Sequence, residues 1–166
     1  GEIIMGSTIH AKISGVKGES QDTGFTGEID IESYSFSASN PPSDTGGELS
    51  KGKARPSDFG FSIMPGESST KLFDFLNKGQ HIDEVVVSFS KTSGEGQQSV
   101  YKTMKFKNCF MSSYSEGGSD NNADQPEHFS LAFTAIEKEY KAQATAGGGL
   151  SNAANAKWDY QKSSEA

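Results

Sequence analysis

The chain has 166 residues, of which 33% are hydrophobic and 22% are charged, and this length fits one domain with a core that is stable without cross-links. The formal net charge of -7 argues against nucleic acid, whose phosphates are bound by clustered Lys and Arg, and against an anionic membrane surface. Cys109 is the only cysteine, so an intramolecular disulfide is excluded, and no apolar run approaches the length of a membrane span.

Alternation of apolar and polar residues dominates the first forty positions and predicts two strands. The first strand has three apolar residues on one face, Ile9, Ala11 and Ile13. The second strand is predicted over residues 26–39, where the apolar residues change from odd to even positions. Because this change needs an inserted residue or a bulge, we expect the strand to bend near Glu32 or Ser33.

The next thirteen residues have no period and contain two prolines, which a central strand does not tolerate. We therefore expect a long projecting loop made of Asn40, Pro41, Pro42, Ser43, Asp44, Thr45, Gly46, Gly47, Glu48, Leu49, Ser50, Lys51 and Gly52.

A third strand, marked by alternating aromatic and aliphatic residues over 59–63, precedes the one helix that the sequence predicts, residues 68–78. Ser68 or Ser69 is the expected N-cap and Gly79 the expected end. The apolar face of this helix is formed by Leu72, Phe75 and Leu76, and the i,i+4 spacing allows one ion pair, between Asp74 and Lys78.

The remaining strands follow in quick succession. Val85, Val87 and Phe89 mark one strand, and a hairpin loop over residues 91–96 leads to an antiparallel partner over 100–111. In that partner, one face is predicted to hold Met104, Phe106 and Phe110, and the other Lys105 and Lys107.

The last strand, residues 129–141, follows a polar loop and changes parity between Phe133 and Ile136, which predicts a second bend. Residues 142–166 are rich in Gly, Ala and Asn and are expected to form a flexible C-terminal tail. The predicted fold is mainly β, a curved two-sheet β-barrel over residues 1–141 with one short α-helix and a long projecting loop.

No group of residues forms a convincing reaction or metal site. The histidines, His10, His81 and His128, lie in or beside separate strands without a second ligand at a metal-binding spacing, so structural roles are favoured. Cys109 lies within an alternating strand and is expected to be a buried, unreactive thiol. We therefore expect no catalytic residue, no metal and no cofactor.

Three weaker patterns have simpler interpretations. The stretch 94–99 resembles a phosphate-binding glycine loop but joins two strands instead of opening a helix, so it is expected to be a hairpin turn. Calcium-loop spacing is present in Asp120, Asn122 and Asp124, but Gln125 and Leu131 replace the required Gly and Glu, which favours a solvated loop. A glycosidase-like carboxylate pair could come from Glu28, Asp30 and Glu32, but such a row more often marks a wet strand face.

The order of elements resembles that of the Hcp family, the tube-forming proteins of bacterial type VI secretion systems. The local sequences that carry the resemblance are residues 16–20 after the first strand, 78–79 at the helix end, 91–95 in the hairpin, 112–119 after its partner strand, and the aromatic-rich last strand ending at Tyr140. The resemblance spans about residues 8–141. Many relatives have Trp in the second strand where this chain has residues 34–37, and the C-terminal tail is unusually long.

The resemblance implies a structural subunit and not an enzyme. Hexameric rings would stack head to tail into a tube, capped by a VgrG spike, driven by a contractile sheath and able to carry small effector proteins. Residues 40–52 match the position of the family's extended loop, which contacts the adjacent ring. The resemblance also implies assembly in the bacterial cytoplasm and then export to the extracellular space or a target cell without a signal peptide.

Two other functions remain open from the sequence. A small carbohydrate-type ligand-binding β-module is compatible with the 10% aromatic content and polar loops, although most aromatics follow the core parity. A phage-like tail-tube protein would share the same assembly logic.

Overall fold

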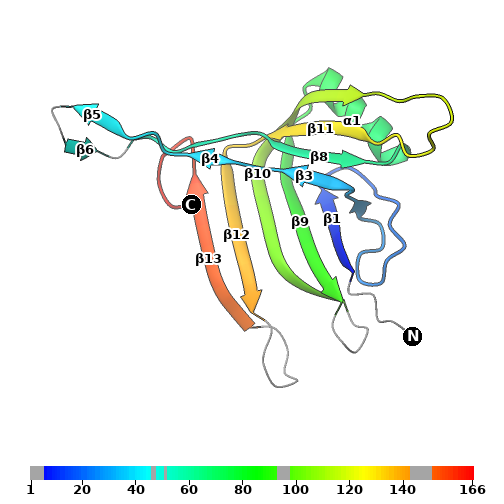
Figure 1. Cartoon of the computed structure of the whole chain (residues 1–166), viewed down its shortest axis with the longest axis horizontal. Coiled ribbons are helices and arrows are strands. Elements are labelled where there is room, and N and C mark those ends of the chain that lie inside the picture. The colour runs from blue at the N-terminus through cyan, green and yellow to red at the C-terminus, as the bar shows by residue number, and fades with distance from the viewer. Residues whose placement is uncertain (1–5, 46–47, 51, 93–97, 143–150) are drawn as a thin grey trace.

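Two curved antiparallel sheets share one long strand, β10 (Gln98–Glu116), as Figure 1 shows. The computed structural model describes residues 6–45, 48–50, 52–92, 98–142 and 151–166. On one side of β10 the first sheet continues through β9 (Ile82–Thr92), β1 (Ser7–Ile13) and β2 (Ile29–Asp30), and on its other side through β12 (Ala135–Ala142) and β13 (Ser151–Asp159). The last part of β10 begins the second sheet, which continues through β11 (Glu127–Ala132), β8 (Phe59–Ile63) and β3 (Ser33–Ser35).

The two sheets meet again at a corner of the chain between β2 and β3. The path of paired strands begins at β2 and ends at β3, which are consecutive segments separated by two residues. At this corner the Ile31 amide donates to Ile9 in the first sheet (2.9 Å), and the Glu32 amide donates to Ser62 in the second sheet (2.8 Å). The predicted bend at Glu32 or Ser33 is therefore confirmed, and the barrel is completed by the covalent chain instead of a hydrogen-bonded strand pair.

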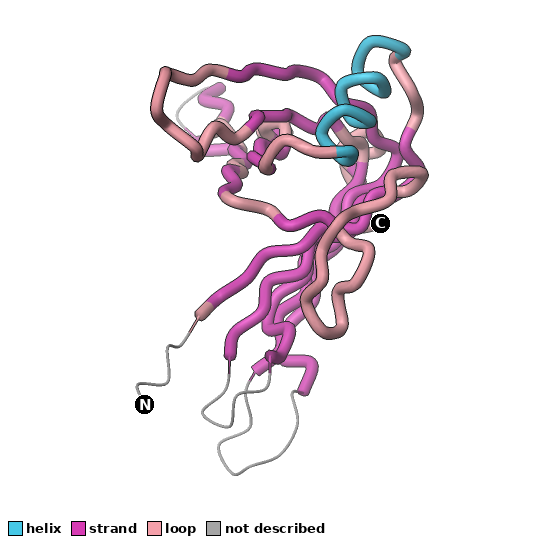
Figure 2. Tube along the Cα trace, turned by 90° about the vertical axis from the view of Figure 1, so that its right-hand side faces the viewer, coloured by secondary structure: helices cyan, strands magenta, loops and turns pink. Residues whose placement is uncertain are grey.

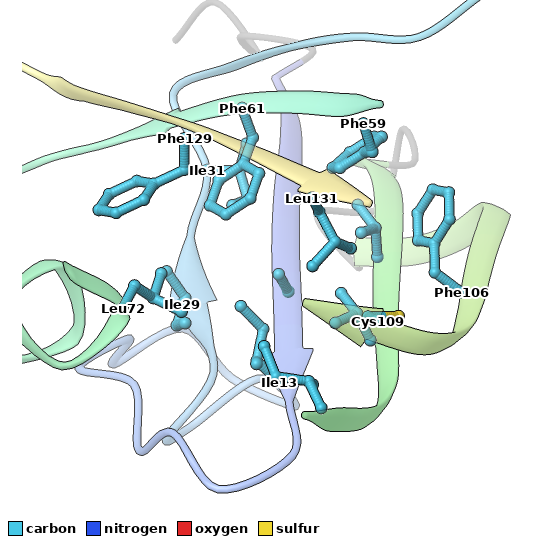
Figure 3. Close-up of a cluster of buried hydrophobic side chains, with 14 of the residues drawn as sticks. Ile13, Ile29, Ile31, Phe59, Phe61, Leu72, Phe106, Cys109, Phe129 and Leu131 are labelled. Atoms are coloured by element: carbon cyan, nitrogen blue, oxygen red, sulfur yellow. The ribbon is translucent and has the colours of Figure 1, made fainter. Parts of the chain in front are cut away.

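Apolar side chains from both sheets and the helix point into one shared core (Figure 3). Aromatic rings connect the strands: the ring centroids of Phe59 and Phe106 lie 4.8 Å apart, and those of Phe61 and Phe129 lie 5.7 Å apart. Alternation from sequence correctly predicts the buried faces of β8 and β9. A mainly-β fold with one helix and two curved sheets is thus confirmed.

The single helix among the described residues is α1 (Glu67–Lys78), which lies at the end of the molecule occupied by the second sheet (Figure 2). No helix of the described residues is both long and apolar enough to span a membrane. The predicted end is confirmed, since Gly79 adopts a left-handed conformation with a φ of 61° and donates its N–H to the last turn. Lys78 also pairs with Asp74 at 2.9 Å, as predicted.

The predicted N-cap of α1 is wrong. The helix begins after Gly66, and both serines lie inside its first turn. Ser69 accepts a hydrogen bond from the Gly66 amide (2.8 Å), and Ser68 donates to the Lys17 carbonyl (3.1 Å). The Glu67 amide donates instead to Oε1 of Glu19 (2.6 Å), so a distant carboxylate caps the helix.

Strand β10 departs from its predicted parity. Met104 and Phe106 are buried as expected, but Phe110 is 50% exposed, while Cys109 and Met111 are buried. Asn108, between the two halves, has a φ of 53°, which interrupts the alternation of side chains. The change of parity between Phe133 and Ile136, by contrast, is confirmed as the break between β11 and β12.

The expected flexible tail is wrong for residues 151–159, which form β13 and pair with β12 along their length. Trp158 lies opposite Ile136 in this pairing and packs against the core. The Tyr160 amide donates to the Thr134 carbonyl (2.8 Å), which fixes the chain after the strand. Burial of these aromatic side chains offsets the conformational entropy that the segment loses when it forms a strand. The small polar residues alone would not offset this loss.

Candidate assembly surfaces and polar clusters

The stretch predicted as a projecting loop extends away from both sheets as an arm (Figure 1). The arm comprises residues 38–56 and contains two short ladders. At its base β4 (Ala38–Ser39) pairs with β7 (Arg55–Pro56), and further out β5 (Ser43–Thr45) pairs with β6 (Glu48–Ser50). The predicted projection is confirmed, although this stretch contains short strands where none was predicted. Gly46, Gly47 and Lys51 lie outside the described residues.

The direction of the arm is fixed by close contacts between its two sides. At the base Ser37 and Ser57 exchange two hydrogen bonds, of 2.7 and 2.9 Å. Further along, a side-chain carbon at Gly52 would overlap the carbonyl oxygen of Pro41. The chain can therefore approach itself this closely only with glycine at position 52.

Strand β13 forms an outer edge of the first sheet. It pairs with β12 on one side, and no other strand of the described chain pairs with its second side. Asn155 of β13 donates to Glu137 of β12 at 2.9 Å, and this hydrogen bond, assisted by Lys157, lowers the pKa of Glu137. An edge with free backbone groups can accept a strand from another chain.

The buried histidine His10 meets two carboxylates that the sequence pattern did not connect with it. Its Nε2 lies 2.7 Å from Oδ2 of Asp22 and 3.1 Å from Oδ1 of Asp30. Asp30 faces His10 across the β1–β2 ladder, and Asp22 arrives from the following turn. Spacing along the sequence does not reveal these partners, because they are 12 and 20 positions away from His10.

The other residues considered as possible ligands or nucleophiles, His81, His128 and Cys109, do not join this cluster. His81 lies 3.1 Å from Asp83 on the exposed surface, and His128 is exposed on β11. Cys109 is fully buried, and its burial, together with the charge of Glu84, raises the pKa of the thiol to about 12. The expectation of a buried cysteine is confirmed, and the raised pKa accounts for low nucleophilicity.

The acidic patterns have structural partners. In the polar loop, Asp120 accepts the Asn121 amide and Asn122 accepts the Asp124 amide, each at 3.1 Å. These oxygens stabilise loop turns. In the row of Glu28, Asp30 and Glu32, which is predicted to be a wet strand face, Asp30 also contacts His10.

These features together define the class: a mainly-β protein whose prominent surfaces are a projecting arm and an open sheet edge. Residues 10–140 match the family described as "Type VI secretion system effector, Hcp", and the chain belongs to this family. Type VI secretion tube proteins form this family, which gives the chain a structural role in an oligomeric, secreted tube.

Individual relatives agree with this assignment. The chain is 28% identical over 144 residues to Protein hcp1 of Pseudomonas aeruginosa, covering 86% of this chain and 88% of that protein. It resembles a solved type six secretion system protein with a TM-score of 0.87 and 22% identity, covering 97% of this chain and all of that one. It also resembles Hcp1 from Salmonella typhimurium, with a TM-score of 0.76 and 24% identity, covering 98% of this chain and 100% of that chain.

Proposed function

We propose that this chain is the repeating subunit of a type VI secretion inner tube, in which six copies close into a ring and rings stack head to tail. The observation that carries the proposal is the arm, which extends beyond the two sheets that hold the core (Figure 1). An isolated subunit gains little from such an extension, whereas a stacked ring would give it a surface to contact.

Ring closure would use the edges of the sheets. The outer side of β13 is one such edge, and an interface that repeats by rotation generates a closed ring. The described core is already complete within one copy, so the edges can be used for association without opening the barrel.

Residues 40–52 would contact the adjacent ring, and their role follows from position and not from any single side chain. The contact at Gly52 and Pro41 sets the direction in which the arm leaves the barrel. Stacking would therefore depend on the geometry at the base of the arm, even where the tip is unchanged.

The same function implies partners outside the tube. A VgrG spike would cap the stacked rings, a contractile sheath would drive them, and small effectors would travel in the lumen. Assembly would take place in the bacterial cytoplasm, followed by export to the extracellular space or a target cell. The family match favours this function over a carbohydrate-binding module, which would need an exposed aromatic platform.

The experiment separates ring stacking from ring formation with Gly52→Ala. A methyl group here should push the two sides of the arm apart, so we expect rings of normal mass but fewer and shorter stacks in electron micrographs. Gly117→Ala is the matched control, since a methyl group at Gly117 meets nothing within 4 Å. Stacks of unchanged length in Gly52→Ala, with the arm displaced, would refute a stacking role.

A further inference from the structure

The cluster around His10 brings two acceptors to one donor. A neutral imidazole that carries its proton on Nε2 can donate one hydrogen bond, yet this nitrogen lies 2.7 Å from Asp22 and 3.1 Å from Asp30. The ligand atoms of all three residues lie within 4.8 Å of one another. One proton therefore serves two carboxylates, and the cluster has an excess of negative charge.

The imidazole ring is held rigidly in this position. His10 is only 1% exposed and stacks on Phe25, with ring centroids 4.1 Å apart and an interplanar angle of 3°. Its backbone lies in β1, between β2 and β9. The turn that supplies Asp22 is fixed by hydrogen bonds from the Asp22 amide to Ser20 (3.2 Å) and from the Phe25 amide to the Asp22 carbonyl (2.9 Å). The three groups are thus preorganised.

The two sides of the cluster differ in their access to solvent. Nδ1 of His10 is buried and has no hydrogen-bond partner among the described residues. Asp22 and Asp30, by contrast, are 48% and 57% exposed and open to ions from solvent.

We propose that Nε2 of His10 and the carboxylates of Asp22 and Asp30 form a binding site for a divalent transition-metal ion of the zinc type. Such an ion binds nitrogen and oxygen at about 2.0–2.2 Å, which separates neighbouring ligand atoms by about 3–3.5 Å. The exposed carboxylates, now 2.7 and 3.1 Å from Nε2, would therefore need to move outward only slightly to accommodate the ion. The exposed carboxylates leave the remaining coordination positions to water. This inference is independent of the proposed tube function.

The donor set determines which ions bind. An imidazole with two carboxylates suits Zn²⁺, Co²⁺ or Ni²⁺, whereas Ca²⁺ and Mg²⁺ prefer oxygen ligands alone. Metal binding at Nε2 places the ring proton on Nδ1 of His10, which lacks a hydrogen-bond acceptor. Loss of such an outer contact typically weakens metal affinity by about 10–100-fold, so we expect micromolar binding.

The test is calorimetric titration of the untagged full chain with ZnCl₂, and with CaCl₂ in parallel. Asp22→Asn and Asp30→Asn each remove one charged ligand from an exposed position, and each should weaken Zn²⁺ binding at least about tenfold. The matched control is His81→Gln, which removes a histidine paired with a single carboxylate, Asp83, and should leave binding unchanged. Imidazole ¹⁵N shifts in a Zn²⁺ titration should identify Nε2 of His10 as the coordinating atom.

Three results would overturn the proposal. The first is the absence of saturable Zn²⁺ binding at millimolar concentration. The second is wild-type affinity in both aspartate variants, with circular dichroism confirming that they are folded. The third is an equal loss of binding in His81→Gln, or equal affinity for Ca²⁺, either of which would indicate diffuse surface binding.

Discussion

The N-terminus of α1 offers a double-mutant test of a long-range cap. Oε1 of Glu19 accepts the Glu67 amide at 2.6 Å, from a position 48 residues earlier in the chain. Glu19→Ala removes this acceptor and leaves a first-turn N–H group without it. Loss of an N-cap acceptor costs about 0.5–2 kcal/mol of unfolding free energy, typically about 1 kcal/mol. For a chain of this size, that lowers the melting temperature by about 2–4 °C.

Gly66→Ala should act through the same contact. Its added carbon would lie 2.9 Å from Oε1 of Glu19, which displaces the carboxylate from the Glu67 amide. The Gly66 backbone is extended, with a φ of 176°, so alanine introduces no backbone strain there. Alanine also makes the unfolded chain less flexible than glycine does, which stabilises the folded state by about 0.4–1 kcal/mol. We therefore expect a net loss of about 0.5 kcal/mol in the wild-type background and a gain of 0.4–1 kcal/mol in the Glu19→Ala background.

The assay is chemical denaturation of the wild type, both single variants and the double variant at equal protein concentration. The expected coupling energy is about 1 kcal/mol, well above the 0.3–0.5 kcal/mol within which independent sites add. Gly117→Ala is the control for a glycine substitution in open space. Additive effects of Glu19→Ala and Gly66→Ala would contradict the assignment of Glu19 as the cap.

Three other predictions concern β13 and the core. Trp158→Ala should lower the free energy of unfolding by about 2 kcal/mol, measured by thermal unfolding, which is less than for a fully buried Trp because this side chain is half-buried. The control, Lys162→Ala, changes an exposed side chain and should leave stability unchanged. Equal effects of the two variants would contradict an ordered β13. Asn155 donates the hydrogen bond that lowers the pKa of Glu137, so Asn155→Ala should reduce stability above pH 4.5, the ordinary pKa of Glu137. The difference from wild type should disappear as the pH falls through the lowered pKa of the folded state. A difference in stability that grows in acid would contradict this stabilising role of Asn155. Cys109 should resist alkylation by iodoacetamide at pH 8 until the protein unfolds, because its pKa is raised to about 12; rapid labelling of the folded chain would contradict its burial.

Local periodicity was sufficient to predict most of the fold. The change of apolar parity before Ser33 and between Phe133 and Ile136 marks the places where the chain leaves one sheet for the other. Such bends are visible in the sequence because a strand that keeps one face in the core must insert a residue when it turns. Gly79 likewise identified the helix end through its own backbone preference.

Features that depend on distant residues could not be predicted in this way. The cap of α1 comes from Glu19, and the partners of His10 come from a turn and from the neighbouring strand. The positive φ of Asn108 is not visible in the pattern of apolar residues, so the exposure of Phe110 was not predicted. For the helix cap and for His10 the deciding contact is a tertiary one, absent from any local window.

Strand β13 was missed although the sequence contains a weak signal for it. Ala154, Ala156 and Trp158 alternate with Asn155 and Lys157, which is a strand period with mostly small side chains. The surrounding Gly- and Asn-rich composition suggested a flexible segment instead. Pairing with β12 and burial of the tryptophan decide in favour of a strand.

The assignment of this chain to a tube is tested most directly by imaging the purified protein end-on in an electron microscope. Class averages should show six-fold rings around an open centre, together with stacks in side view. Only monomers, across a concentration series that reaches the highest soluble concentration, would contradict the proposed tube subunit.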